Sequence, residues 1–439
     1  MSTATTLINI RVFDGTRVTT ATAARFTGPL ITQLGDRAIA EPGDVLVDGH
    51  GGMLLPGLID AHTHLLSGAL HQALAFGVTT ELDMFSKPEL ARRLRQQAGV
   101  RSDMADLRSA GIGATAPGGH PSMMYGDFPY ATGPEQAEEF VLARIADSSD
   151  YLKIFYDRGV KTPIPVPQLS RQTLDALVKA GRAHGLTVVV HANSAEAASD
   201  AVDAGAHGLQ HVPADGVFDD EFVERVVERG VTVTPTLVTI EAALRRQSGG
   251  LLLADPDLGP FLGEFWRRHL LPAPNGWLGE GGPDYDLALA NTAKLIEAGV
   301  VLLAGTDVPS PGTVHGASLH HELELLVEAG LPAEQALRAA TSGPAAAYGL
   351  TDRGTVEVGK RADLLLVDGD PTADITHTRK IVRIWRGGVE HDRTGFTGSS
   401  VEQVLIDALR ARVQRVMDAV REFVPAEAYR AMKQQSVTG

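Results

Sequence analysis

Short apolar runs alternate with amphipathic segments from about residue 58 onward. Runs such as TVVVHA, residues 187–192, are apolar on both faces, which is typical of buried parallel strands. Between them, apolar residues recur at helical spacing, with Ser170 as an N-cap before one segment and Gly299 closing another. The runs expected to form strands are residues 57–65, 77–85, 105–116, 151–157, 186–193, 207–213, 230–238 and 300–307. Eight strands alternating with helices predict an α/β fold with a (β/α)8 TIM barrel, whose chemistry lies at the C-terminal strand ends.

The segments that flank this pattern differ from it. Residues 1–57 and residues 356–400 contain short strands and turns, and we expect both segments to pair into one small β-sandwich domain. The barrel would then span residues 58–355. Residues 401–439 carry apolar positions at helical spacing until Pro425, which predicts a C-terminal helix packed on its own barrel or on a neighbouring subunit.

Composition narrows the classes of function. The 439 residues are 44% hydrophobic and 21% charged, as in ordinary soluble globular proteins. A net charge of −15 argues against nucleic-acid and anionic-membrane partners. The absence of cysteine excludes disulfides and thiolate zinc sites, so histidine, carboxylate or modified groups must hold any metal. We see no signal peptide and no membrane-spanning run, and we expect a cytoplasmic location.

Polar residues with metal-ligating chemistry occupy the ends of the expected strands. His62 and His64 end the run GLIDAHTHL, and because alternate side chains of a strand share a face, the two imidazoles can share a metal. Later runs carry Lys153 on the fourth strand, His191 on the fifth, His211 on the sixth and Asp307 on the eighth. Such nitrogen and oxygen donors suit zinc or a similar divalent ion.

The lysine decides how many metals the set could hold. His62, His64 and Asp307 give one metal three ligands and leave a position open. His191 and His211 could hold a second metal if an anion bridged the pair. The ammonium of Lys153 cannot ligate, but carboxylation by CO2 would make it a bridging carbamate. Alternatively, the ammonium pairs with a buried acid or extends to the end of the strand. A water between two metals would lose a proton near neutral pH and attack an electrophilic carbon.

Together these features resemble the amidohydrolase superfamily. The resemblance rests on the HxH of DAHTHL, the lysine on strand four, the single histidines after strands five and six, and GTD after strand eight. In addition, the segment TSGPAAAYGLTDRGTVEVGKRADLLLVD is similar to the segment in which chains of that superfamily pass from the barrel back to the β-sandwich. The resemblance covers about residues 5–395 and favours the imidazolonepropionase-like and metal-dependent dipeptidase, or prolidase-like, branch. It implies His62, His64 and Asp307 on one metal, His191 and His211 on another, carboxylated Lys153 as the bridge, and Asp307 as proton shuttle.

The resemblance implies a binuclear, zinc-preferring hydrolase of amide, peptide or carbamate C–N bonds in small substrates such as dipeptides or N-acyl amino acids. It also implies a homo-oligomer. Lys153 departs from imidazolonepropionase, which resembles a one-metal variant. The alternatives are a mononuclear cyclic amidine hydrolase or deaminase, a lactonase, esterase or phosphotriesterase-like enzyme, and a binding protein on an inactive barrel. The last alternative predicts a missing ligand, and none is missing from the sequence.

Substrate-binding residues are less clearly marked. His120 and Tyr125, in the segment 115–133 after the third strand, are candidates for contacting substrate or stabilising an oxyanion, and each could equally be an ordinary loop residue. His320 and His321 are expected to be plain helix residues. Asp60 is a candidate for orienting a ligand histidine, and Arg158 for binding a substrate carboxylate, with a solvated loop arginine as the alternative. Tyr156 and His315 are candidates for lining the pocket. Trp266, Trp277 and Tyr285 could form an apolar lid or pack against the barrel wall.

Overall fold

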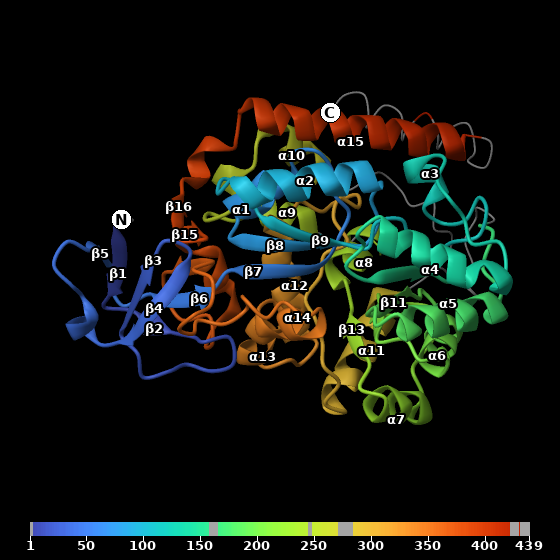
Figure 1. Cartoon of the computed structure of the whole chain (residues 1–439), viewed down its shortest axis with the longest axis horizontal. Helices are drawn as coiled ribbons and strands as arrows, with labels where there is room; N and C mark the ends of the chain where they lie inside the picture. Colours follow the sequence, from blue (N-terminus) through green and yellow to red (C-terminus); the bar gives the residue numbers. More distant parts are fainter. Residues whose placement is uncertain (1–2, 158–165, 245–247, 271–283, 422–429, 431–439) are drawn as a thin grey trace.

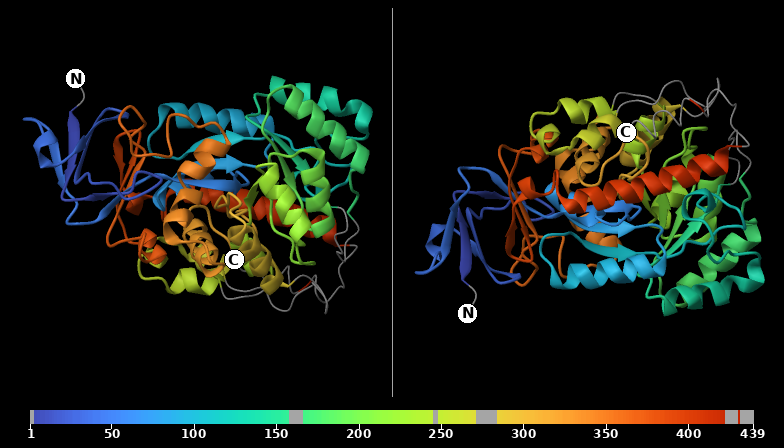
Figure 2. Two further views of the ribbon diagram at one scale, coloured as in Figure 1. Left: turned by 90° about the horizontal axis from the view of Figure 1, so that it is seen from below. Right: turned by 90° about the horizontal axis from the view of Figure 1, so that it is seen from above.

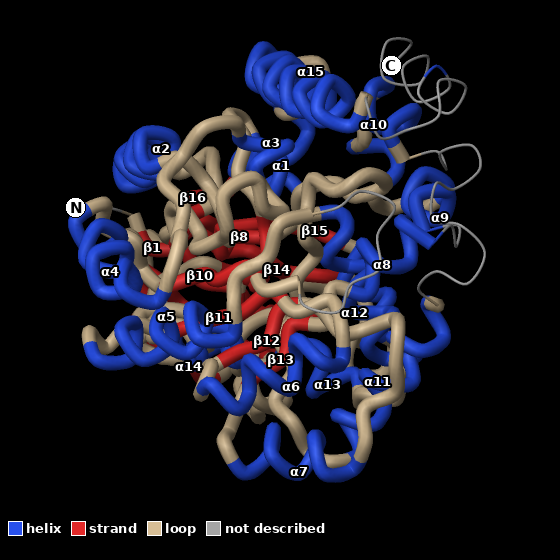
Figure 3. The backbone as a smooth tube through the Cα atoms, turned by 90° about the vertical axis from the view of Figure 1, so that its right-hand side faces the viewer, coloured by secondary structure: helices blue, strands red, loops and turns tan. Residues whose placement is uncertain are grey.

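The computed structural model describes residues 3–157, 166–244, 248–270, 284–421 and 430 (Figure 1). Strands from both ends of the sequence lie together at one end of the molecule, and a helix-rich body makes up the rest (Figure 1 and Figure 2). In this body, helices surround a central group of short strands (Figure 3). The arrangement is that of an α/β protein, as the sequence predicts.

Two parallel sheets form the centre of the helix-rich body, with the orders β7–β8–β9 and β10–β11–β12–β13. Their strands are β7 (Leu58–Thr63), β8 (Val78–Asp83), β9 (Asp106–Ser109), β10 (Leu152–Phe155), β11 (Val188–His191), β12 (Gly208–Gln210) and β13 (Thr232–Thr234). Every residue of β7, β8, β10 and β11 is buried. This burial on both faces explains the nearly continuous apolar runs in the sequence.

Single parallel bridges connect the two sheets to each other and to the eighth apolar run. They join Ala114 to Ile154, Val233 to Leu302 and Thr63 to Val308. These isolated bridges do not extend into ladders, so the described strands do not form one closed barrel.

The strand expected at residues 300–307 is not formed as a regular strand, because its backbone donors are diverted. Ala304 donates its N–H to the carbonyl of Ala339, and the Thr306 N–H is shared between Asp60 Oδ1 at 3.1 Å and the His62 carbonyl at 3.2 Å. Asp307 then adopts a left-handed φ of 54°, which no extended strand contains. The run ends as a bent segment that aims Asp307 at the end of β7.

Helices cover the outside of the two parallel sheets. Ser170 accepts a hydrogen bond from the Thr173 N–H and so caps α5, as the sequence predicts. The α-helices of the body are α1 (Ala69–Ala75), α2 (Pro88–Val100), α3 (Ser122–Tyr125), α4 (Ala137–Ala146), α5 (Arg171–Ala183), α6 (Ala195–Ala204), α7 (Asp220–Glu228), α8 (Leu237–Leu244), α9 (Ser248–Ala254), α10 (Glu264–His269), α11 (Tyr285–Glu297), α12 (Ala317–Glu328), α13 (Ala333–Ala339) and α14 (Ser342–Ala347). Short 3-10 turns are η1 (Arg37–Ile39), η2 (Pro134–Gln136), η3 (Gly259–Phe261), η4 (Ile375–Arg379) and η5 (Arg393–Gly395).

The flanking segments form two further sheets that share one apolar cluster. Their strands are β1 (Ala4–Ile8), β2 (Arg11–Val12), β3 (Ala23–Thr27), β4 (Leu30–Gly35), β5 (Val45–Asp48), β6 (Met53–Pro56), β14 (Leu364–Val367), β15 (Ile381–Arg386) and β16 (Val389–His391). The sheet orders are β4–β3–β1–β5 and β16–β15–β14–β6–β2, and β14 pairs with β6 in antiparallel register. Phe26 and Trp385 meet edge to face in the buried cluster, with ring centres 5.9 Å apart. The predicted domain limits stay a prediction.

The long helix α15 (Ser400–Val420) packs on its own chain. Ser399 caps it by accepting the Glu402 N–H. Leu405 and Leu409 are buried in one cluster with Trp266. Pro425 lies outside the described residues. Within the described part of the chain, we find no helix whose length and apolar character would allow it to cross a membrane.

A buried charge cluster joins β9 to the segment that returns to the flanking sheets. Asp106 is 9% exposed, and its Oδ2 accepts hydrogen bonds from Arg353 at 2.6 Å and Arg361 at 3.0 Å, with Arg386 at 3.9 Å. Burial raises the pKa of Asp106, but the charges of Arg353, Arg386 and Arg361 outweigh burial and hold this pKa well below its usual value. The carboxylate therefore stays ionised and holds three cations.

Asp106→Asn is expected to lower the free energy of unfolding by about 3–5 kcal/mol at neutral pH, because buried guanidinium groups lose their counter-ion. The pKa of Asp106 is lower in the folded than in the unfolded chain, so its stabilising effect is present above the unfolded value of 3.8 and is lost as the pH falls through the folded value. In urea unfolding, the difference between wild type and variant should shrink below about pH 4.

Asp103→Asn is the matched control, since Asp103 pairs with Arg101 at 2.5 Å but its side chain is 52% exposed. We expect this control to lose less than about 1 kcal/mol. Equal losses in the two variants would contradict a structural role of the buried cluster.

Candidate metal centre

Three predicted ligands converge where β7 ends. His62 Nε2 lies 3.3 Å and His64 Nε2 lies 3.1 Å from the same oxygen, Asp307 Oδ1. The Asp307 N–H donates to the His62 carbonyl at 2.7 Å, and the left-handed backbone of Asp307 then turns its carboxylate toward both rings. Strained backbone of this kind is held in place mainly at functional sites. His62, His64 and Asp307 form one group of donors able to hold a metal ion, which we call the first donor group.

The far ring nitrogens of three site histidines are fixed by hydrogen bonds. The pairs are His62 Nδ1 with Gln210 Oε1 at 2.7 Å, His64 Nδ1 with the Tyr125 hydroxyl at 3.0 Å, and His211 Nδ1 with Thr236 Oγ1 at 2.7 Å. Partners of this kind orient a metal-binding imidazole and leave its Nε2 as the ligand atom. The buried Nε2 of His62 has no hydrogen-bond partner in the described part of the chain.

His120, Asp157 and His191 form a second donor group at the end of β11. Asp157 Oδ1 lies 2.8 Å from His191 Nε2, and Asp157 Oδ2 lies 3.8 Å from His120 Nδ1. The ring of His211 lies between the groups, with its centre 4.5 Å from that of His191 and 4.8 Å from that of His62. The structure therefore brings together all four predicted histidine ligands, and adds Asp157 and His120 to them.

Lys153 lies on β10 and is fully buried. Its Nζ has no hydrogen-bond partner among the described residues, and none of their carboxylates pairs with it. Burial lowers the pKa of Lys153 to about 7, against the opposing charges of Asp307 and Asp157. Asp307 and Asp157 act on the amine through their charges, but no carboxylate of the described residues forms an ion pair with it.

The protonation states of the donors suit a cation. Burial lowers the pKa of His62 to about 3 and also lowers the pKa of His64. Burial raises the pKa of Asp307, but His62 and His64 outweigh it and hold this pKa well below the usual value. Neutral imidazoles beside an ionised carboxylate are the forms that bind divalent metals, so the residues fit such an ion.

Asp157 was missed from the sequence although a signal for it was present. Lys153, Phe155 and Asp157 alternate along the fourth run, and alternate positions of a strand share a face. Burial raises the pKa of Asp157, but the facing His191 and His120 lower it to about 2. Asp157 is therefore an ionised carboxylate beside the second donor group.

Two of the weaker candidates serve other contacts. Asp60 does not touch an imidazole; its Oδ1 accepts the backbone N–H groups of His62 and Thr306, each at 3.1 Å, and so fixes the two chain segments that carry ligands. Tyr156 donates from its hydroxyl to Asp200 Oδ2 at 2.7 Å, on the neighbouring α6.

The other candidates lie away from both donor groups or outside the described residues. His315 is hydrogen-bonded to Glu81 at 2.8 Å, and both side chains are fully buried. His320 and His321 lie on α12, as expected for helix residues. Trp266 and Tyr285 are buried in apolar clusters. Arg158 and Trp277 lie outside the described residues.

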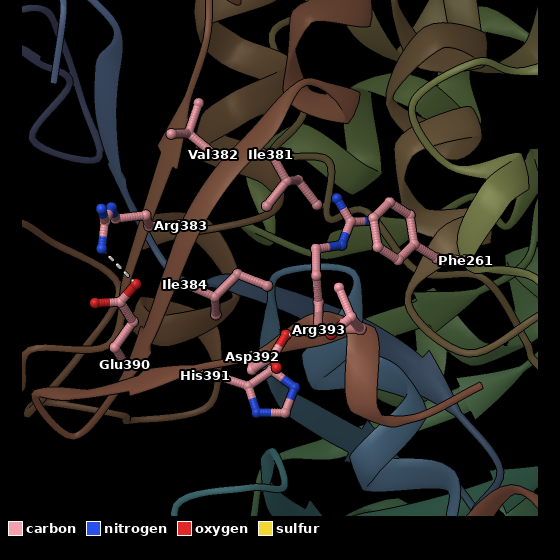
Figure 4. Close-up of a pocket in the computed structure, with 10 residues that line it drawn as sticks. Phe261, Ile381, Val382, Arg383, Ile384, Glu390, His391, Asp392 and Arg393 are labelled. Carbon is pink, nitrogen blue, oxygen red and sulfur yellow. Dashed lines mark hydrogen bonds and ion pairs between the residues drawn. The ribbon is translucent and has the colours of Figure 1, made fainter. Parts of the chain in front are cut away.

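A cavity of about 570 Å³ lies apart from both donor groups, beside β15 and β16 (Figure 4). Phe261 and Arg393 form part of its wall, and the guanidinium carbon of Arg393 lies 3.6 Å from the centre of the Phe261 ring. None of the donor residues lines this cavity.

Comparison with known proteins places these features in a family context. The model of the amidohydrolase family matches residues 53–390. Imidazolonepropionase of Deinococcus radiodurans is 25% identical over 399 residues, which cover 80% of this chain and 86% of that protein. Adenine deaminase of Geobacillus kaustophilus is 24% identical over 400 residues, which cover 86% of this chain and 59% of that protein. Among solved structures, a Xaa-Pro dipeptidase with bound methionine matches this chain with a TM-score of 0.69 and 24% sequence identity, over 89% of this chain and 100% of that chain. This similarity implies the TIM-barrel fold.

Proposed function

We propose, from the premise that this chain belongs to the amidohydrolase family, that it binds two divalent metal ions and hydrolyses an amide-type C–N bond. Family membership makes the chain a hydrolase of C–N bonds; the two-metal site, zinc as the ion, and a dipeptide or N-acyl amino acid as substrate are our proposal. The residues that would hold the ions are His62, His64 and Asp307 for one and His191 and His211 for the other, bridged by carboxylated Lys153.

The observation that carries the proposal is the buried amine of Lys153, which has no hydrogen-bond partner among the residues that the structure describes. An unpaired polar atom in a buried site is unfavourable. A carbamate at this position would be an anion with two oxygens, and the remaining ligands would be His62, His64 and Asp307 for one ion and His191 and His211 for the other. The two groups are connected through His211, whose ring lies close to those of His62 and His191.

Each side chain of the site has a role in this reaction. When bound, the metal ions would polarise the scissile carbonyl and lower the pKa of the attacking water. Asp307, kept ionised by His62 and His64, accepts a proton from that water and passes it to the leaving nitrogen. His120, whose side chain is 33% exposed, is placed to donate a hydrogen bond to the developing oxyanion. Tyr125 acts through His64 as a positioning residue.

A reaction with one metal is the second candidate, because imidazolonepropionase and adenine deaminase are among the relatives. It would use His62, His64 and Asp307, with the second donor group binding substrate. A lysine without a bridging role would then stay unmodified. Metal stoichiometry and substrate range separate the two candidates.

Elemental measurement of protein purified without chelator is expected to find about two divalent ions per chain. A panel of dipeptides and N-acyl amino acids should be turned over by that protein. Removing the metal with a chelator should reduce turnover by more than roughly 100-fold, and zinc should restore it, because the ions polarise the carbonyl and activate the water. One ion per chain, with turnover confined to ring substrates, would contradict the two-metal proposal.

We also propose that the flanking sheets form a domain of their own. Residues 1–57 and 356–400 contribute to it, residues 58–355 form the catalytic body, and residues 401–439 form the C-terminal helix. The shared cluster around Phe26, Leu54 and Trp385 supports this division.

A further inference from the structure

The C-terminal helix α15 brings a buried cation against α3. The helix begins at Ser400, beyond the segment 53–390 that the family model matches, and lies along α3 (Figure 1). Arg412 on this helix is 7% exposed, and its Nη2 donates to Met124 Sδ at 3.1 Å. Its guanidinium carbon lies 4.9 Å from the centre of the Tyr125 ring.

Tyr125 connects this cation to the first donor group. Its hydroxyl lies 3.0 Å from His64 Nδ1, and the Nε2 of the same imidazole contacts Asp307. Phe85 packs against the tyrosine ring, with the ring centres 4.2 Å apart. The charge of Arg412 also acts on His64, so the guanidinium lies close to the first donor group.

Arg412 has no carboxylate partner among the described residues, and its buried Nη1 has no hydrogen-bond partner there. The carboxylates whose charges act on Tyr125 are Asp83 and Asp307. Both are bound by other groups: Asp83 by Ser86, Ser109 and the Leu65 N–H, and Asp307 by His62 and His64. A buried guanidinium without a counter-ion is unfavourable, which favours a ligand that supplies the negative charge.

We propose that Arg412 binds a free carboxylate of the substrate, so that the C-terminal helix completes the substrate site. The proposal rests on the proposed function and restricts its substrate class to compounds with a free carboxylate. The substrate is then an N-acyl amino acid or a dipeptide, and not a neutral carbamate, lactone or ring amidine. The planar guanidinium can bind both carboxylate oxygens, and its contacts with Tyr125 and Met124 hold it in position. Arg412 is then a binding residue contributed from outside the barrel.

The test compares N-acetyl-leucine with its primary amide, which differ only in the carboxylate. Wild-type protein is expected to prefer the acid. Arg412→Met should lower kcat/KM for the acid by at least roughly 30-fold while changing the amide by less than about threefold, because a charge pair is lost only for the acid. Arg412→Lys should fall between wild type and Arg412→Met, since an ammonium keeps the charge but not the two parallel hydrogen bonds.

Arg415→Met is the matched control. Arg415 lies one turn further along α15, donates from Nε to the Met124 carbonyl at 3.1 Å and is exposed. This variant should keep the preference for the acid. If Arg412→Met slowed the acid and the amide equally, Arg412 would act only by holding Tyr125, and the proposal would be wrong.

Calorimetric binding separates this proposal from the proposed function. Zinc-loaded protein carrying Asp307→Asn is titrated with N-acetyl-leucine and with its amide, with and without Arg412→Met. If the wild type hydrolyses neither compound but the protein binds the acid through Arg412, the proposed function fails and the binding proposal stands. Equal binding of acid and amide by protein that retains Arg412 overturns the binding proposal, even if no Arg412 variant folds.

Discussion

Lys153→Ala is expected to lower kcat/KM for an amide substrate by at least roughly 1,000-fold, because the site loses the anion proposed to bridge two cations. Metal content should fall from about two ions per chain to one or none. The variant should still fold, since it replaces a buried, unpartnered amine with a small apolar side chain. Elemental measurement and steady-state kinetics on the same preparation check both effects.

Lys179→Ala is the control for this substitution, since Lys179 is exposed on α5 and should be replaceable without effect. A carbamate also predicts a carbon-13 resonance that appears in wild-type protein supplied with labelled bicarbonate and is missing from Lys153→Ala. Full activity of Lys153→Ala with a single bound ion would favour the mononuclear alternative.

Asp307→Asn is expected to lower kcat by roughly 1,000-fold even with zinc in excess, because the amide cannot accept the proton of the attacking water. The carboxylate is kept ionised between His62 and His64, and no other described carboxylate contacts both rings. Kinetics at saturating zinc, with metal content measured in parallel, distinguishes a lost proton acceptor from a lost ligand.

Asp175→Asn, at an exposed position of α5, should leave kcat unchanged. If added zinc restored the full rate of Asp307→Asn, the carboxylate would serve only as a ligand. Another group would then have to move the proton.

The convergence of the first donor group could be predicted from two simple rules. Alternation along a strand places His62 and His64 on one face, and the strand-end rule for barrels places Asp307 near them. The structure agrees with both, at distances of 3.3 and 3.1 Å. The rules could not predict the backbone turn at Asp307. Before this turn, backbone N–H groups of the eighth run donate to Asp60 and to Ala339, and contacts with residues so distant in sequence cannot be read from the run itself.

The second donor group was predicted only in part. His191 and His211 were expected to be ligands of one metal, and the centres of their rings lie 4.5 Å apart; His191 Nε2 also contacts Asp157, and the His120 ring lies 4.6 Å from the His191 ring. The alternation with Lys153 could have identified Asp157. Arg412 could not have been found by any strand rule, since it lies 288 residues from Met124 on a helix outside the barrel pattern. Contacts of this kind depend on tertiary packing.

The antiparallel pairing of β6 with β14 also affects how the chain is synthesised. β6 leaves the ribosome about 300 residues before β14. Until then one edge of β6 has open backbone donors and acceptors, and such an edge invites association with other chains. We therefore expect nascent fragments of this protein that end before β14 to aggregate or to be held by chaperones, because the edge of β6 closes only when β14 has emerged and pairs with it.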